Sequence, residues 1–121
     1  TPPDVAALDA KDIRRGMPRF HPENYAHNLK LLDGYAAIAQ DAGCSMAQLS
    51  LAWVLSRGEH VVALPGTTQI AHLEEDLGAT TVSLRADTLQ QLDALINRRS
   101  VSGARYNPAT QVEVDTEEYG P

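Results

Sequence analysis

Residues 60–78 read HVVALPGTTQIAHLEEDLG, and this stretch decides the fold that the sequence predicts. The apolar run 61–64 is typical of a short strand that is buried on both of its faces. Pro65 and Gly66 interrupt the run, because proline lacks a backbone donor and glycine tolerates backbone angles that other residues avoid. A helix is expected to follow from about Gln69 to Leu77. The stretch therefore predicts a strand, a sharp turn and a helix start.

The turn also carries groups that suit a phosphate. Thr67 and Thr68 place hydroxyls and backbone N–H groups at the start of the following helix. A helix N-terminus has unpaired donors and a partial positive charge, so it favours an anion. An ordinary strand-to-helix turn with threonine capping has the same residues. The turn alone therefore leaves both interpretations open.

Three further helices are expected around this stretch. The first runs from Pro22 to Gly43, with proline in the first turn and glycine at the stop. The second starts after Ser45, where Ser45 and Gln48 form a capping box, and ends at Gly58. The last covers about 86–98, where Arg85 stands at the cap instead of a hydroxyl residue. The apolar positions repeat at steps of three or four and are expected to face inward: Tyr25, Leu29, Leu32, Ala36, Ala39 and Ala42, then Leu49, Ala52, Trp53 and Ser56, then Ile70, Leu73 and Leu77, then Leu89, Leu92, Leu95 and Ile96.

The two ends of the chain are more polar. A short ordered piece is expected at 5–8, followed by a loop at 12–20 that contains three arginines. Residues 100–121 read as a polar tail with little regular structure. The acids Asp115, Glu117 and Glu118 are interpreted there as a solvated run.

Composition excludes several classes of function. The formal net charge of the 121 residues is −6, which would repel nucleic acid. The second helix has only Arg57 as a basic residue, so a DNA-binding helix-turn-helix is not expected either. No apolar run approaches the ~20 residues of a membrane span. With a single cysteine, Cys44, no disulfide framework forms, and the four histidines lack metal-ligand spacing. A cytoplasmic protein without a metal site is expected.

Two linked motifs resemble the aldo-keto reductase family. Leu64–Thr68 followed by 72–79 (HLEEDLGA) is similar to the last barrel strand and cofactor loop of that family. The helix segment Met46–Leu55 also matches, in register and at the family's spacing. The resemblance covers roughly 12–96 and implies an α/β fold, the (β/α)8 TIM barrel, in an NADP-dependent enzyme that reduces aldehydes or ketones.

Length limits what this chain contributes to such a barrel. A (β/α)8 barrel typically takes ~250 residues, and the chain has 121. We therefore expect residues 1–121 to be a single partial domain, the C-terminal segment of the barrel, mainly α-helical with about one strand. Its expected partners are the remainder of the barrel or further copies of itself, with a small carbonyl substrate in the parent protein.

The resemblance assigns cofactor-binding residues but no catalytic ones. The tyrosine, lysine, aspartate and histidine that serve the family's chemistry come from the first half of the barrel, and their motifs do not occur here. Thr68 and His72 stand where relatives often have cations, and Asp76 stands where they have an amide. Both changes reduce the positive charge that favours NADP. The residues expected to contact NADP are Gly66, Thr67, Thr68, His72, Glu75, Asp76 and, from the arginine-rich loop, Arg19.

One alternative from another class stays open at this point. Helices joined by short turns are also typical of a free-standing helical protein-interaction module without enzymatic activity. Sequence upstream of Thr1 with several strand-helix units would favour the enzyme.

Overall fold

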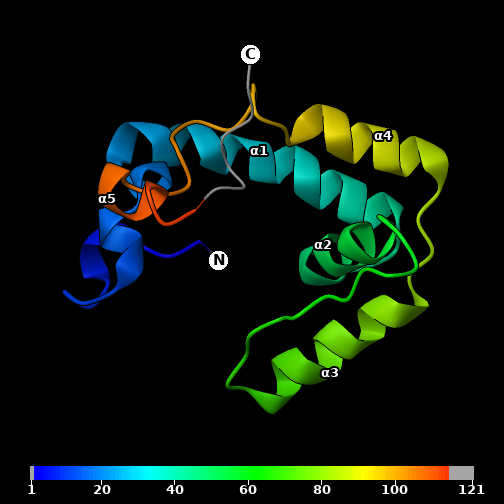
Figure 1. The fold of residues 1–121 in the computed structure, drawn as a ribbon. Coiled ribbons are helices and arrows are strands. Elements are labelled where there is room, and N and C mark those ends of the chain that lie inside the picture. Colours follow the sequence, from blue (N-terminus) through cyan, green and yellow to red (C-terminus); the bar gives the residue numbers. More distant parts are fainter. Residues whose placement is uncertain (1, 115–121) are drawn as a thin grey trace. The chain divides into compact units, whose positions relative to one another are not determined.

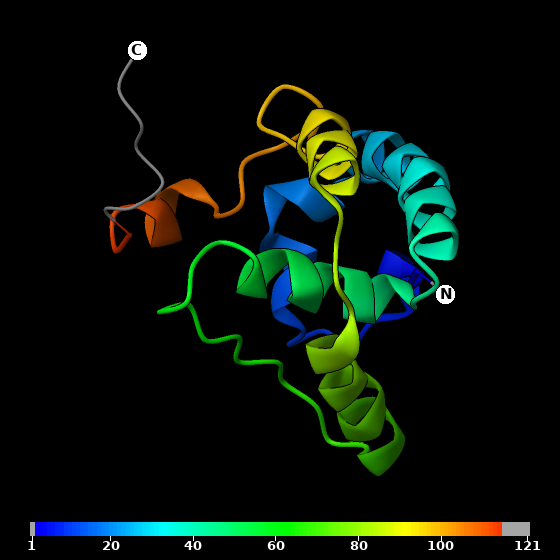
Figure 2. The ribbon, with the colours of Figure 1, turned by 90° about the vertical axis from the view of Figure 1, so that its right-hand side faces the viewer.

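The computed structural model describes residues 2–114, and its regular elements are all helical (Figures 1 and 2). The α-helices of this range are α1 (Pro22–Asp41), α2 (Met46–Leu55), α3 (Ile70–Gly78), α4 (Ala86–Leu95) and α5 (Pro108–Gln111). Single 3-10 turns occur at Val5–Ala7, Ile13–Gly16, Pro18–Phe20 and Ala79–Thr81. Contacts divide the chain into two compact units. One is Leu31–Asn97, and the other joins the residues up to Lys30 with those from Arg98 onward.

The helix starts follow the local chemistry of the sequence. The capping box at the start of α2 is confirmed: the Gln48 amide donates to Ser45 Oγ at 3.2 Å, and the Ser45 amide donates to Gln48 Oε1 at 3.1 Å. Gly43 follows α1 with a φ of 68°, a conformation that glycine adopts without steric cost. Arg85 gives α4 no side-chain cap, as its replacement of a hydroxyl residue implies.

The core of the Leu31–Asn97 unit lies where α1, α2 and α4 meet. Ala39, Leu49 and Leu92 are almost fully buried, one from each helix. Tyr35 and Ile38 pack against them, together with Ala42, Cys44, Trp53 and Leu84. Ala36, which the apolar stripe placed inside, is exposed. The inward face of α1 therefore follows positions 35, 38, 39 and 42, where Tyr35 and Ile38 supply the large side chains and the two alanines allow close packing. Ser56 and Ile96 were also expected inside and are exposed.

Cys44 belongs to this core and not to a reactive site. It packs against the buried cluster, and burial raises the pKa of its thiol. A raised pKa lowers the thiolate fraction at neutral pH, so the side chain is expected to be inert.

Trp53 and Asp93 link α2 to α4. The Trp53 indole donates to Asp93 Oδ1 at 2.8 Å, which supplies the partner that a packed tryptophan needs. Arg57 donates to the same oxygen at 2.6 Å, and its guanidinium carbon lies 3.8 Å from the centroid of the Trp53 ring. One carboxylate thus holds two side chains of α2.

The expected strand at 61–64 is not formed. The segment between α2 and α3 runs as an extended loop without a neighbouring strand in Figure 1, and residues 2–114 contain no strand at all. Val62 and Leu64 are 77% and 91% exposed. A strand needs a partner to pair its backbone groups, and no other segment of the described chain supplies one. The prediction was wrong for this chain because a parallel strand depends on its neighbours.

Helix α3 is present within a residue of its expected bounds, but its apolar face points outward. Ile70, Leu73 and Leu77 are 77%, 47% and 60% exposed, although they were expected to face inward. Glu75 and Asp76, on the other side of α3, are half-buried. Helix α3 packs against α2 by this more polar side, so the apolar face lacks a covering layer in the described chain.

The unit that contains both ends of the described chain is held together by a polar network between α1 and the loop after Ser100. Asn28 bonds Ser102 twice, from Nδ2 to the carbonyl at 2.9 Å and from the Ser102 amide to Oδ1 at 2.8 Å. Ser102 Oγ donates to Asn24 Oδ1 at 2.6 Å, and His27 Nε2 lies 2.9 Å from the Ser100 carbonyl. The loop therefore lies firmly along the first half of α1.

Gly103 is required at the end of that network. Its φ is 84°, and a Cβ there would lie 2.7 Å from Asn24 Nδ2 and 3.0 Å from the Pro18 carbonyl. Only glycine adopts this φ without strain and lacks the Cβ that would clash with these two atoms. The tail is thus better ordered than expected as far as α5, while the acidic run 115–118 lies outside the described residues.

Candidate functional site

The loop 65–69 and the start of α3 carry most of the residues predicted to contact a cofactor. Gly66, Thr67, Thr68 and His72 are all exposed. These residues make few contacts. Thr67 Oγ1 accepts a hydrogen bond from the Gln69 amide at 3.1 Å, and a Cβ added at Gly66 would have no atom within 4 Å. The loop is open to a ligand.

The start of α3 leaves backbone donors available. Gln69 is the N-cap and contributes no side-chain hydrogen bond to the helix. The first bond of the helix is the Leu73 amide to the Gln69 carbonyl at 3.1 Å. Since the amides of residues 70–72 precede it, they have no acceptor in the described chain. Three unpaired donors therefore point along the helix axis toward the loop.

Gln48 fixes α3 against α2. Beyond its part in the capping box, its Nε2 donates to the Glu75 carbonyl at 3.0 Å. Gly78 lies directly beside the same amide, since a Cβ there would come 2.4 Å from Gln48 Nε2. One side chain thus caps α2 and orients α3. The sequence revealed the cap but not this second contact, which joins residues 27 positions apart.

His72, Glu75 and Asp76 occupy one side of α3, at spacings of three and four residues. This side is distinct from the apolar face formed by residues 70, 73 and 77. Two carboxylates beside one imidazole give this side a negative balance near neutral pH. The helix N-terminus and the loop donors are the groups here that would attract an anion.

Arg19 lies in the other unit. Its Nε donates to the Gly103 carbonyl at 3.3 Å, so the loop held by Asn24 and Asn28 also fixes this guanidinium. The other two arginines of the same loop are engaged: Arg14 pairs with Asp12 at 2.6 Å, and Arg15 donates to the carbonyls of Ala6 and Leu8.

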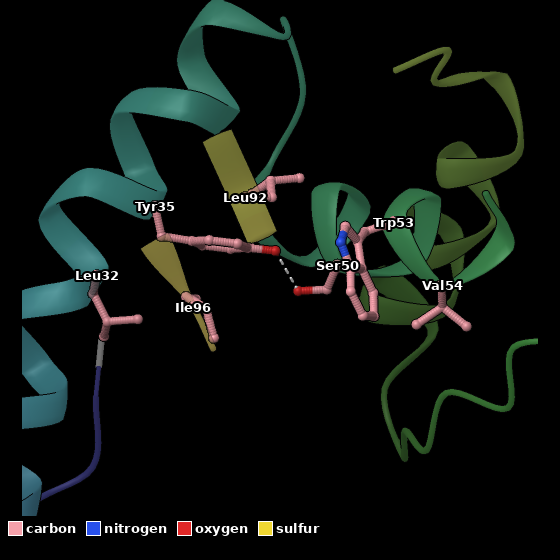
Figure 3. Close-up of a pocket in the computed structure, with 7 residues that line it drawn as sticks. All are labelled: Leu32, Tyr35, Ser50, Trp53, Val54, Leu92 and Ile96. Atoms are coloured by element: carbon pink, nitrogen blue, oxygen red, sulfur yellow. Dashed lines mark hydrogen bonds between the residues drawn. The ribbon is translucent and has the colours of Figure 1, made fainter. Parts of the chain in front are cut away.

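A separate apolar cavity lies inside the Leu31–Asn97 unit. It has a volume of about 430 Å³, and Figure 3 shows Tyr35 directed toward Ser50 on its wall. The two hydroxyls lie 2.7 Å apart, and burial raises the pKa of Tyr35. They satisfy each other, so few polar groups remain to orient a substrate. None of the predicted cofactor residues lines it; the lining residues are Leu32, Tyr35, Ser50, Trp53, Val54, Leu92 and Ile96.

The described range contains neither a cluster of metal ligands nor a helix that could span a membrane. Between residues 2 and 114, no three side chains of histidine, cysteine, aspartate or glutamate come together closely enough for a metal ion. Within the same limits, no helix has the length and apolar content that crossing a bilayer requires.

Comparison with known proteins gives one family. The sequence profile described as "Aldo/keto reductase family" matches residues 5–97. The chain is 36% identical over 107 residues to "Aldo-keto reductase yakc [NADP(+)]" of Schizosaccharomyces pombe, covering 87% of this chain and 32% of that protein. It is 38% identical over 92 residues to "Probable aldo-keto reductase 1" of Glycine max, covering 76% of this chain and 27% of that protein. The chain thus spans about a third of the length of these relatives.

Proposed function

The chain belongs to the aldo-keto reductase family, and we propose that it supplies the part of an NADP-binding site that holds the 2′-phosphate and adenine of the cofactor. The family is built on the (β/α)8 barrel, and this chain corresponds in our proposal to the C-terminal segment of one. Residues 1–121 then form one partial domain of a reductase for small aldehydes or ketones. The likeness to a relative whose name includes NADP(+) supports the choice of cofactor.

The observation that carries the proposal is the open helix start at α3. Three backbone amides without acceptors face an exposed loop of glycine and threonines, and His72 stands one turn into the helix. An anion placed there gains hydrogen bonds and the favourable end of the helix dipole. We assign the 2′-phosphate to Gly66, Thr67, Thr68 and His72.

We assign the adenine of the cofactor to the acidic residues of α3. Glu75 and Asp76 are half-buried, on the side of α3 opposite to its apolar face. A carboxylate accepts hydrogen bonds, and the exocyclic amine of adenine donates them. The same charges weaken phosphate binding, so we expect a smaller preference for NADP over NAD than a cationic loop would give. Arg19, in the other unit, remains a proposed contact to the cofactor.

The reaction itself needs groups from outside this chain. Bound NADPH supplies a hydride to the carbonyl carbon of the substrate. A proton donor for the developing alkoxide is then required, and we carry none over to this chain. The residues assigned here bind and orient the cofactor.

The exposed surface of α3 supports the remainder of the barrel as partner. In a barrel, helices cover the strands with an apolar face, and strands pair along both edges. Ile70, Leu73 and Leu77 present such a face, and Val62 and Leu64 lie in an unpaired extended segment. We propose that neighbouring strands of the same barrel fit both features.

We also propose that the protein works in the cytoplasm. The chain has a net charge of −6, and its single cysteine, Cys44, is a free thiol, as is usual for proteins of a reducing compartment.

The test is selective binding of the 2′-phosphate. The ¹⁵N-labelled chain is titrated with 2′,5′-ADP and with 5′-AMP, and amide shifts of residues 66–72 are followed. We expect tighter binding of 2′,5′-ADP, and a His72→Glu variant that loses affinity for it more than for 5′-AMP. His21→Glu, an exposed histidine of the other unit, is the matched control. Equal losses for the two nucleotides would remove His72 from the phosphate site.

A further inference from the structure

A groove in the unit that joins both ends of the described chain is lined by two arginines and a tyrosine. It measures about 560 Å³ and lies between the 3-10 turn at Pro18–Phe20 and the segment that leads into α5. Its lining residues are Pro18, Arg19, Ala104, Arg105, Tyr106, Pro108 and Gln111. None of these lining residues, all within the described range, is acidic. Arg19 and Arg105 both carry a positive charge in a chain whose net charge is −6.

Arg19 is held in place on one edge only. Its Nε donates to the Gly103 carbonyl, and the network of Asn24, Asn28 and Ser102 fixes that carbonyl. The two terminal nitrogens of Arg19 make no hydrogen bond or ion pair to any residue between 2 and 114. A guanidinium anchored through Nε keeps its planar pair of Nη donors in a defined direction. That arrangement matches the two oxygens of a carboxylate.

The rest of the lining favours a small organic anion over a bare inorganic ion. Tyr106 contributes a ring, with the guanidinium carbon of Arg105 5.3 Å from its centroid, and Pro18 and Pro108 contribute apolar rings. Gln111 adds an amide to the lining. An apolar wall desolvates a flat hydrocarbon body while the guanidinium binds its charged end.

We propose that this groove is a binding site for small planar carboxylates, with Arg19 as the bidentate anchor and Tyr106 as the stacking surface. Arg19 is also a proposed cofactor contact, whereas the other residues of the groove are distinct from those of the loop at 66–72. Benzoate binding is tested without the cofactor. The groove site also gives the Asn24–Asn28–Ser102 network a role beyond stability, because that network sets the position of Arg19.

The test uses benzoate as the probe and benzamide as its neutral counterpart. The ¹⁵N-labelled 121-residue chain is titrated with each. Benzoate is expected to shift the amides of residues 19, 104–106 and 111 saturably, and benzamide to leave them unchanged. Arg19→Gln should weaken benzoate binding about 10-fold or more, as expected for loss of a charged hydrogen-bonding partner. Arg15→Gln, a change of the same charge in the same unit but outside the groove, should bind benzoate normally.

The Ser102 amide shift shows whether Arg19→Gln keeps the loop in place, and Arg19→Lys separates charge from shape. The lysine variant should bind benzoate more weakly than the wild type, since an ammonium lacks the planar fork. Three results would each overturn the proposal: absence of benzoate shifts in the groove, equal binding of benzamide, or unchanged benzoate affinity in Arg19→Gln. Tighter binding of inorganic phosphate or 2′,5′-ADP at the same amides would also overturn it, and would make the groove a phosphate site.

Discussion

Asp93 is an exposed side chain of α4 that binds two side chains at the end of α2. Its Oδ1 accepts from the Trp53 indole and from Arg57, while Arg57 also stacks on the Trp53 ring. Hydrogen bonds from Arg57 and then Trp53 lower the pKa of Asp93 below its ordinary value. A lowered native pKa means that the ionised form stabilises the fold.

We expect the acid sensitivity of α2–α4 packing to depend on Asp93. Its contribution is fully present above the unfolded pKa of about 3.9 and is lost as the pH falls through the lower native pKa. The Asp93→Asn variant should lose this contribution at all pH values and show a flatter stability profile below pH ~4. The measurement is urea unfolding followed by Trp53 fluorescence at several pH values.

Asp33→Asn provides the control for that experiment. Asp33 is exposed and makes no hydrogen bond or ion pair in the described part of the chain. The stability of the Asp33→Asn variant should depend on pH in the same way as that of the wild type. An Asp93→Asn profile that parallels the wild type through the acid range would contradict the assignment.

At the scale of elements, α2 and α3 depend on each other through Gln48. The side chain closes the capping box of α2 and donates to the Glu75 carbonyl of α3. Loss of a cap costs roughly 0.5–2 kcal/mol in other proteins. Gly78 packs directly against the same amide group, since a Cβ there would lie 2.4 Å from Gln48 Nε2.

Gln48→Ala should therefore destabilise α2 and release α3. We expect a fall of about 1 kcal/mol in the free energy of unfolding and faster hydrogen exchange at α3 amides than at α1 amides. Urea denaturation and exchange measured by NMR give the two quantities. Gln91→Ala, an exposed glutamine of α4, serves as the comparison and should change neither. Unaltered exchange in α3 would show that Gln48 does not position it.

At the scale of the whole molecule, the described chain exposes apolar surface and an unpaired extended segment. Ile70, Leu73 and Leu77 form an uncovered face on α3, and the extended segment at 61–64 has no strand beside it. Apolar faces and unpaired strand segments both favour association. The chain alone is therefore expected to self-associate or to bind the rest of a barrel.

Sedimentation in dilute buffer tests this expectation. The wild-type chain should form oligomers, and the double variant Ile70→Gln/Leu77→Gln should shift the distribution toward monomer. Val112→Gln, which removes one exposed apolar side chain of the other unit, should have little effect. A wild-type monomer with a cooperative thermal transition would favour the free-standing interaction module instead.

The sequence by itself determined the features that depend on neighbouring residues. The four longest helices and the capping box at Ser45 follow from spacing and from local hydrogen bonding, and they formed within a few residues of the expected bounds. The family followed from motifs in the same stretches. Local interactions operate within a few residues, so the sequence contains what is needed to infer them.

Only the tertiary structure decided which partner each group meets. The apolar run 61–64 has the composition of a strand, yet a strand exists only where another chain segment pairs with it. The stripe on α3 has the pattern of a core face, yet it is exposed because nothing in the described chain covers it. Asp93 as the acceptor of Trp53, Gln48 as the link to α3, and Gly103 as the anchor of Arg19 join residues that are 27 to 84 positions apart. Such contacts depend on packing between distant segments, which periodicity along the sequence does not encode.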